Sequence, residues 1–239
     1  ILKKAIGHHE VIIETPNHDE HLSQARITQL IQVIHAYRDR LKALSSLDYV
    51  RYVSIFRNYG ADAGASLFHP HTQIIATPII PSIVNEELIK SEKYWEENKK
   101  CIFCKIINEE EKSERFIWKN DDFIVFSPWA SVHPFEFWIF PKRHQPSILF
   151  MSEREIRSFA ITIRVSFGGL RNLLDDPSYN LGFHMITSDC YHWHVEVYPR
   201  LMQGLEGFVK STGIFVNTMP PEEAAICLKE AFEKEEDEL

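Results

Sequence analysis

Residues 10–18, EVIIETPNH, return in altered form as residues 136–144, EFWIFPKRH. Each stretch has an acid at its start, an apolar segment, a proline, and a histidine eight residues after the acid. Each is followed by a long segment of helical period, two strand-like segments and a His-x-His. Because the two copies agree in order, residue type and spacing, the sequence predicts an internal duplication.

The predicted fold class is α+β, with two fused halves that each consist of an antiparallel sheet and a packed helix. Apolar residues at helical spacing predict a first long helix within residues 19–44, and Leu22 is the first residue of its stripe. A capping box of Ser152 and Glu155 predicts where the second long helix begins. Further helices are expected in 82–100 and from Pro220 onward, and strands in 49–58, 71–80, 114–120, 123–128, 135–141, 179–188 and 194–201.

We expect the halves to divide as residues 1–98 and 99–239. The second half contains a C-x-x-C, Cys101 and Cys104, before its histidines. The equivalent place in the first half falls before residue 1, and the chain opens without Met. The first half is therefore expected to be incomplete, and a longer protein is expected to carry a further N-terminal segment with its own metal-binding pair.

Composition excludes several classes of function. The net charge of −8 and the lack of a basic stripe argue against a nucleic-acid partner. No apolar run approaches about 18 residues, so no membrane span is expected. Only four cysteines occur, two of them as C-x-x-C, which favours metal or redox chemistry over disulfides and predicts a reducing, cytoplasmic setting.

The second half carries a candidate zinc site. Two thiolates and two imidazoles suit a tetrahedral zinc ion, and four protein ligands would close its shell, as in structural sites. The expected ligands are Cys101, Cys104, His144 and His192. The alternative is a redox-active or buried cysteine pair with unrelated histidines.

His18 and His69 are the counterparts of His144 and His192 in the first half. We expect them to be half of a second zinc site, whose other ligands would come from the further segment. The alternative is that both are ordinary polar histidines.

The stretch HPHTQ, residues 69–73, carries the candidate catalytic residues. In a strand, His71 and Gln73 project from the same face. A neutral imidazole can attack phosphorus once a hydrogen bond from its other nitrogen sets the tautomer, and Gln73 could donate an amide hydrogen to a phosphoryl oxygen. The alternative is a strand histidine that faces solvent. In the second half His194 and Glu196 take these positions, and a carboxylate there would repel phosphate, so that half is expected to be non-catalytic.

A glycine-rich segment, residues 58–66, precedes this strand and contains Asn58, Gly64 and Ser66. Glycines let the backbone approach a phosphate closely, although the segment could equally form a hairpin turn.

These motifs resemble the galactose-1-phosphate uridylyltransferase family, a branch of the histidine-triad superfamily, over nearly the whole chain. The resemblance rests on GASLFHPHTQ, HEVIIETPNH, CIFCKI, HPFEFWIFPKRH, HWHVEVYPRL and GFVKSTGIFVNTMPPEEAA. It implies a pair of fused histidine-triad-like halves, usually as a homodimer. It also implies ping-pong transfer of uridylyl from UDP-glucose to a hexose-1-phosphate through a histidine adduct.

Carried over by position, the resemblance makes His71 the nucleophile, Gln73 the residue that steadies the adduct, and Asn58 and Ser66 phosphate contacts. It likewise makes His18 and His69 ligands of a first metal site, and places the second zinc site at the four Cys and His residues above. Thr72 replaces the usual glycine, and the segment KSTGIFVN lacks a Tyr-Glu pair that some members use near the hexose. A phosphorylase of ADP-glucose or a dinucleotide that uses the same histidine, and a non-catalytic zinc-stabilised nucleotide-binding module, therefore remain alternatives.

Overall fold

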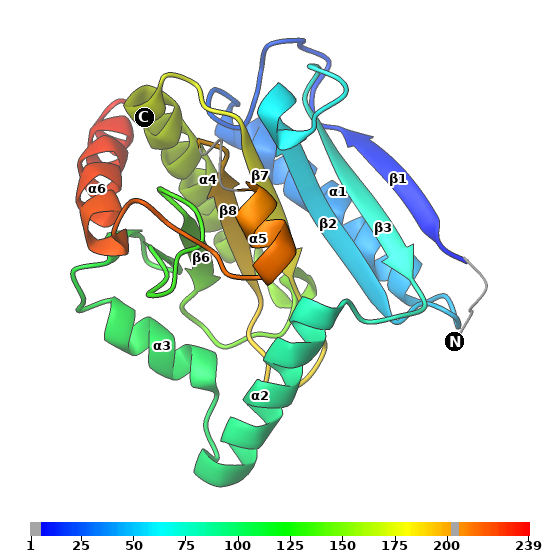
Figure 1. Cartoon of the computed structure of the whole chain (residues 1–239). Helices are drawn as coiled ribbons and strands as arrows, with labels where there is room; N and C mark the ends of the chain where they lie inside the picture. Colours follow the sequence, from blue (N-terminus) through cyan, green and yellow to red (C-terminus); the bar gives the residue numbers. More distant parts are fainter. Residues whose placement is uncertain (1–5, 202–205) are drawn as a thin grey trace.

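The structure is a computed structural model that describes residues 6–201 and 206–239. Within these residues the strands pair antiparallel in one eight-stranded sheet, in the order β1-β3-β2-β7-β8-β6-β5-β4 (Figure 1). The strands are β1 (His8–Ile13), β2 (Tyr52–Tyr59), β3 (His71–Thr77), β4 (Phe116–Lys119), β5 (Phe123–Phe126), β6 (Phe137–Pro141), β7 (Tyr179–His184) and β8 (His194–Pro199). The helices are α1 (Ile27–Ser45), α2 (Ser82–Asn98), α3 (Ile102–Glu110), α4 (Glu153–Leu174), α5 (Glu206–Thr212) and α6 (Pro221–Asp237), with short 3-10 turns at Ala61–Ala63 and Ile148–Phe150.

The strand order confirms the two related halves. On one side of the central β2–β7 pair the order outward is β2, β3, β1, and on the other side it is β7, β8, β6. In each half a long helix, α1 or α4, follows the outer strand of this trio in sequence. The half-sheets therefore join edge to edge, and the α+β class is as expected. A division at residue 98 stays a prediction.

The register corrects one detail of the repeat. Gln73 pairs with Val11, and its counterpart Glu196 pairs with Trp138, so Val11 is equivalent to Trp138. The initial acids of the two stretches, Glu10 and Glu136, are therefore not equivalent, although the sequence alignment matched them. The alignment was one residue out of register because the first half has an extra residue between its strand and His18.

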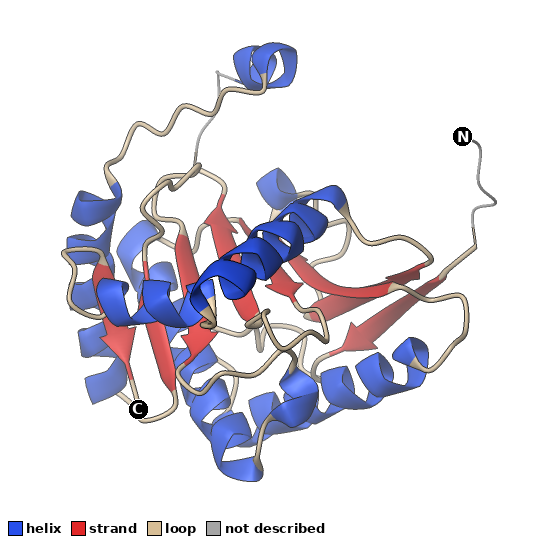
Figure 2. Cartoon of the chain, turned by 90° about the horizontal axis from the view of Figure 1, so that it is seen from below, coloured by secondary structure: helices blue, strands red, loops and turns tan. Residues whose placement is uncertain are grey.

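The two faces of the sheet are covered differently. Helices α1 and α4 lie behind the sheet in Figure 1 and pack on its main apolar core. The other face of the second half is covered by α2 and α3, whose Val84 and Phe103 pack against Phe140 and Tyr191. Figure 2 shows these layers from below, with α5 standing away from the sheet. The same face of the first half is open at β1, where Val11 and Ile13 are half exposed.

The first helix begins later than the sequence predicted. Residues 19–26 form turns, and α1 starts at Ile27. The Glu20 carboxylate accepts hydrogen bonds from Thr15, Asn17 and Arg26, which holds this segment as a loop. Leu22 is buried although it lies outside the helix. Its apolar side chain therefore matched the helical pattern in the sequence and made the predicted helix start too early.

The starts of α4 and α6 agree with their signals, whereas the sequence did not predict the helices α3 and α5. The Ser152 hydroxyl accepts from the Glu155 backbone and the Glu155 carboxylate accepts from the Ser152 backbone, which confirms the capping box of α4. Helix α6 begins at Pro221, as expected for proline in a first turn. No helix in the part of the chain that the structure describes is long and apolar enough to cross a membrane.

Candidate functional site

His71 opens β3 with its ring held in one tautomer. Its Nδ1 lies 2.8 Å from the carbonyl oxygen of His69, so Nδ1 carries the hydrogen and donates it. Nε2 is thereby left with its lone pair. This is the tautomer that attack on phosphorus requires. The side chain is largely buried, but the ring lines a surface pocket.

Asn58 and Ser66 line the same pocket as His71. The Asn58 side-chain oxygen accepts a hydrogen bond from Asn180 at 2.8 Å, which leaves the Asn58 amide hydrogens free to donate. Gly64 lies outside the pocket wall and ends a 3-10 turn with a φ of 79°, a backbone angle that favours glycine. The glycine-rich segment is therefore both a turn and the wall of a pocket.

Gln73 lies on the same face as His71, two residues along β3 and outside the wall of that pocket. Its side-chain oxygen is 2.9 Å from Nε2 of His9 on the neighbouring strand β1. When His9 donates this hydrogen bond, the amide hydrogens of Gln73 remain available to a phosphoryl oxygen. His9 is exposed and opens the stretch HEVIIETPNH, but the sequence analysis gave it no role.

The corresponding histidine of the second half is closed off. His194 has the same tautomer-setting contact, from Nδ1 to the carbonyl oxygen of His192 at 3.2 Å. Its ring is fully buried and stacks on Phe140, and Phe103 of α3 also lies against it. Both histidines are thus buried, but His71 lines a surface pocket whereas His194 is enclosed by aromatic rings, and a catalytic role for the first half alone stays a prediction.

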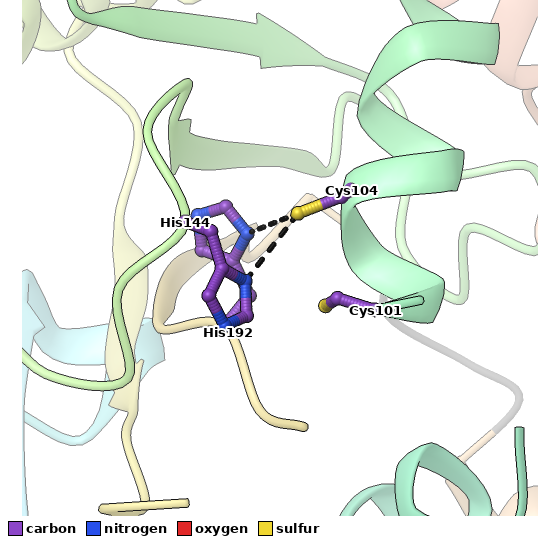
Figure 3. A group of neighbouring side chains, drawn as sticks. All are labelled: Cys101, Cys104, His144 and His192. Atoms are coloured by element: carbon purple, nitrogen blue, oxygen red, sulfur yellow. Dashed lines mark hydrogen bonds between the residues drawn. The ribbon is translucent and has the colours of Figure 1, made fainter. Parts of the chain in front are cut away.

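The four expected zinc ligands lie together at one end of the sheet (Figure 3). One ligand atom from each of Cys101, Cys104, His144 and His192 lies within 4.8 Å of the others. The Cys104 sulfur is 3.4 Å from Nδ1 of His144 and 3.5 Å from Nδ1 of His192. The cysteines come from the start of α3, and the histidines from the loops after β6 and before β8. These residues could hold one metal ion.

The chemistry of the group fits zinc. Nε2 of His144 donates a hydrogen bond to the carbonyl oxygen of Asp189 at 2.9 Å. The lone pair of Nδ1, on the side of the sulfurs, is therefore left to bind a metal ion. A hydrogen bond from Cys104 holds the pKa of the Cys101 thiol below its usual range, which favours the thiolate that binds a metal. Two sulfur and two imidazole donors that converge from three segments are a typical structural zinc set.

His18 and His69 also come together, as the repeat predicts. Their Nδ1 atoms are 3.3 Å apart, and Nε2 of His69 donates to the carbonyl oxygen of Thr15 at 2.8 Å. His144 of the second half has a similar contact, from Nε2 to a backbone carbonyl, although the repeat makes it the counterpart of His18. Two converging imidazole nitrogens are a partial ligand set, and their role in a metal site stays a prediction.

A second group that could hold a cation was missed from the sequence. Glu87 of α2, His184 of β7, and His194 and Glu196 of β8 bring one ligand atom each within 4.8 Å of the others. Although burial opposes its charge, hydrogen bonding from His194 lowers the pKa of Glu196 to about 2. Glu87 and His184 belong to no local motif, and only the packing of α2 across the sheet brings them together.

The repeated half-sheet, with a His-x-His in each half whose second ring lies against the carbonyl of the first histidine, defines a chain of two fused histidine-triad-like halves. Comparison with known proteins narrows this class. The family model described as "Galactose-1-phosphate uridyl transferase, N-terminal domain" matches residues 2–81. A galactose-1-phosphate uridylyltransferase from Thermotoga maritima is 32% identical over 92% of this chain and 73% of its own length. The chain therefore belongs to the galactose-1-phosphate uridylyltransferase family.

Two further relatives bear on the particular activity. An ADP-glucose phosphorylase from Arabidopsis thaliana is 31% identical over 94% of this chain, which spans 64% of that enzyme's length. A solved structure described as a uridylyltransferase superposes with a TM-score of 0.88 at 26% identity, over 95% of this chain and 75% of that one. Relatives of the same fold thus carry the names of two different reactions.

Proposed function

We propose that the protein is a nucleotidyltransferase that passes uridylyl from UDP-glucose to a hexose-1-phosphate through a covalent adduct on His71. The observation that carries this proposal is the tautomer of His71, whose Nδ1 donates to the carbonyl of His69. His71 lines a pocket together with Asn58 and Ser66. Membership of the family supports the reaction class, and the T. maritima relative supports uridylyl as the group transferred.

In the first step, Nε2 of His71 attacks the α-phosphorus of UDP-glucose. A nitrogen–phosphorus bond forms as the bond from phosphorus to the bridging oxygen breaks, and glucose-1-phosphate leaves with that electron pair. The N–H of Nδ1 keeps its hydrogen bond to the His69 carbonyl. This hydrogen bond stabilises the positive charge that the imidazole ring carries in the adduct. In the second step, a phosphate oxygen of the acceptor attacks the same phosphorus, and Nε2 regains its lone pair.

Gln73 is proposed to donate an amide hydrogen to the transferring phosphoryl group. Glutamine cannot act as a general acid, and a departing sugar phosphate needs no proton. An amide at this position therefore suits phosphate leaving groups and acceptors better than alcohols. Asn58 and Ser66 are proposed to donate hydrogen bonds to the other phosphate oxygens.

Zinc is proposed to be structural. Cys101, Cys104, His144 and His192 would hold it, and four protein ligands leave no position for a substrate. When bound, it would supply a tie between α3 and two loops of the sheet, away from His71.

A second candidate function is phosphorolysis of ADP-glucose. The Arabidopsis relative supports it, and so does the Thr212–Gly213 sequence, which lies in the segment that lacks the Tyr-Glu pair some family members use near the hexose. The first step would be the same, and inorganic phosphate would take the place of the hexose-1-phosphate in the second.

The experiment is to incubate the zinc-loaded protein with UDP-glucose or ADP-glucose labelled at the α-phosphorus. Acid-labile label on His71 is expected, and its absence from a His71→Gln variant checks the site. His35→Gln, which changes a partly exposed histidine of α1, is the matched control and should keep the label. Label from only one nucleotide sugar identifies the base, and release by hexose-1-phosphate or by phosphate identifies the acceptor. Zinc-loaded protein that takes label from neither would be a binding module.

A further inference from the structure

A buried ion pair lies beneath the strand that carries His71. Arg57 of β2 and Glu14, just after β1, are both almost fully buried. Nε of Arg57 donates to Oε1 of Glu14 at 3.1 Å, and Nη2 of Arg57 lies 3.1 Å from Oε2 of Glu14. Arg57 also donates to the hydroxyl of Tyr179 and to Nδ1 of His21. Although burial lowers the pKa of Arg57, the charge of Glu14 raises it above its usual range, so the guanidinium stays charged.

Glu14 contacts both neighbours of His71, Thr72 through its carboxylate and Pro70 through its backbone N–H. The Thr72 hydroxyl donates to Oε1 of Glu14 at 2.5 Å, and Tyr37 of α1 lies 2.7 Å from the same hydroxyl. The backbone N–H of Glu14 donates to the carbonyl oxygen of Pro70 at 3.1 Å. Residues 70 and 72 are therefore both tied to Glu14, with His71 between them.

The second half has no such network at the equivalent positions. The sheet register makes Thr72 equivalent to Val195 and Arg57 equivalent to Phe183, and both of these apolar side chains are buried. The same half-sheet is therefore stable with an apolar interior. A buried ion pair seldom stabilises a fold more than apolar packing does. Stability alone thus does not explain why the ion pair lies under the open half.

We propose that Thr72, held by Glu14 and Tyr37, is a positioning residue for His71. By fixing both neighbours of His71, the network sets the tilt of the ring so that Nδ1 meets the His69 carbonyl and Nε2 faces the pocket. Thr72 stands where the family usually has glycine, so the network adds side-chain hydrogen bonds at a place that would otherwise have only backbone. This inference rests on the proposed role of His71 as nucleophile.

The test compares Thr72→Val, which copies the second half, with Thr72→Ser, which keeps the hydroxyl. Misplacement of a reacting group by a fraction of an ångström to 1 Å costs on the order of 10- to 100-fold in rate. Thr72→Val should therefore slow adduct formation at saturating nucleotide sugar by about that factor and leave nucleotide-sugar affinity within about twofold. Thr72→Ser should restore most of the rate. Thr77→Val, at the far end of the same strand, is the matched control and should retain the rate of the unmodified protein.

A second readout separates this inference from the proposed function. Nitrogen-15 NMR of His71 reports which ring nitrogen carries the hydrogen, without any turnover. We expect Nδ1–H in the unmodified protein and a mixture of tautomers in Thr72→Val. A Thr72→Val protein that matches Thr77→Val in both rate and tautomer would overturn the positioning role, as would a rate loss that serine fails to restore. If the unmodified protein forms no adduct, the proposed function fails, and the tautomer comparison alone decides whether Thr72 positions the ring.

Discussion

At the scale of single residues, His21 links the buried ion pair to the stability of the protein at acid pH. Burial, together with the neighbouring Arg57 cation, lowers the pKa of His21 from its usual 6.5 to about 4. Between these values the unfolded chain binds a proton that the folded protein does not. The free energy of unfolding should therefore fall as the pH falls from 6.5 to 4, with a contribution from His21 of at most about 3 kcal/mol.

Urea unfolding at pH 7, 6, 5 and 4 measures this contribution. His21→Gln, which cannot be protonated, should show a shallower fall than the unmodified protein across that window. His35→Gln makes the same substitution at a partly exposed histidine of α1 and is the matched comparison for the slope of His21→Gln. Equal slopes for all three proteins would show that His21 is not held neutral by its surroundings.

The residues of the site differ in how far the sequence could predict them. The repeat assigned His69 and His71 separate roles, and in the structure each ring has one nitrogen against a backbone carbonyl, while the roles themselves stay predictions. The ion pair could not be predicted, because Glu14 and Arg57 are distant in sequence and each reads as an ordinary charged residue. Only the strand register shows that both lie under His71.

At the scale of elements, the N-terminus of α4 gives a stability prediction. The Ser152 hydroxyl caps the helix, and Glu155 completes the box while it also pairs with Arg143, next to the candidate ligand His144. Ser152→Ala leaves backbone N–H groups of the first turn without this partner, so it should cost about 1 kcal/mol of unfolding free energy. Denaturant unfolding of the variant measures the loss.

Ser46→Ala is the matched control for this helix cap. Ser46 is an exposed C-cap residue of α1, where its hydroxyl donates to the Ala43 carbonyl. Its substitution should change the unfolding free energy by less than about 0.5 kcal/mol. If the two serine variants lose the same unfolding free energy, the cap of α4 contributes no more to stability than an exposed serine does.

Local signals located the starts of α4 and α6. The capping box satisfies backbone N–H groups at the start of α4, and proline in the first turn of α6 has no N–H that needs a partner. The start of α1 was not, because the loop before it is held by side chains that converge on Glu20 and leave the apolar period undisturbed. The positions of α2 and α3 over the second half of the sheet also depend on packing between distant segments. The periodicity of apolar residues does not predict such packing.

At the scale of the whole molecule, the β2–β7 pair makes one sheet of the two halves. The repeat predicted two related halves but not which strands would join them, because edge strands of either half carry similar apolar patterns. The candidate zinc group lies in the second half and connects α3 to the loops that flank β6 and β8. Since this half is continuous with the first through the sheet, loss of the metal should weaken the entire fold.

Cys101→Ser tests this coupling through metal content and stability. Serine removes one sulfur ligand, so the purified variant should contain about one zinc equivalent less than the unmodified protein. A ligand present at a thousand times its Kd stabilises a fold by about 4 kcal/mol, and the variant should lose a comparable amount. Elemental analysis and thermal unfolding measure the two effects.

Cys227→Ser, on α6 and outside the group, should keep both the zinc and the melting temperature. Because we propose that the adduct forms in the other half, any Cys101→Ser protein that remains folded should still take label at His71. Full zinc content in Cys101→Ser would mean that the four residues are not the zinc ligands.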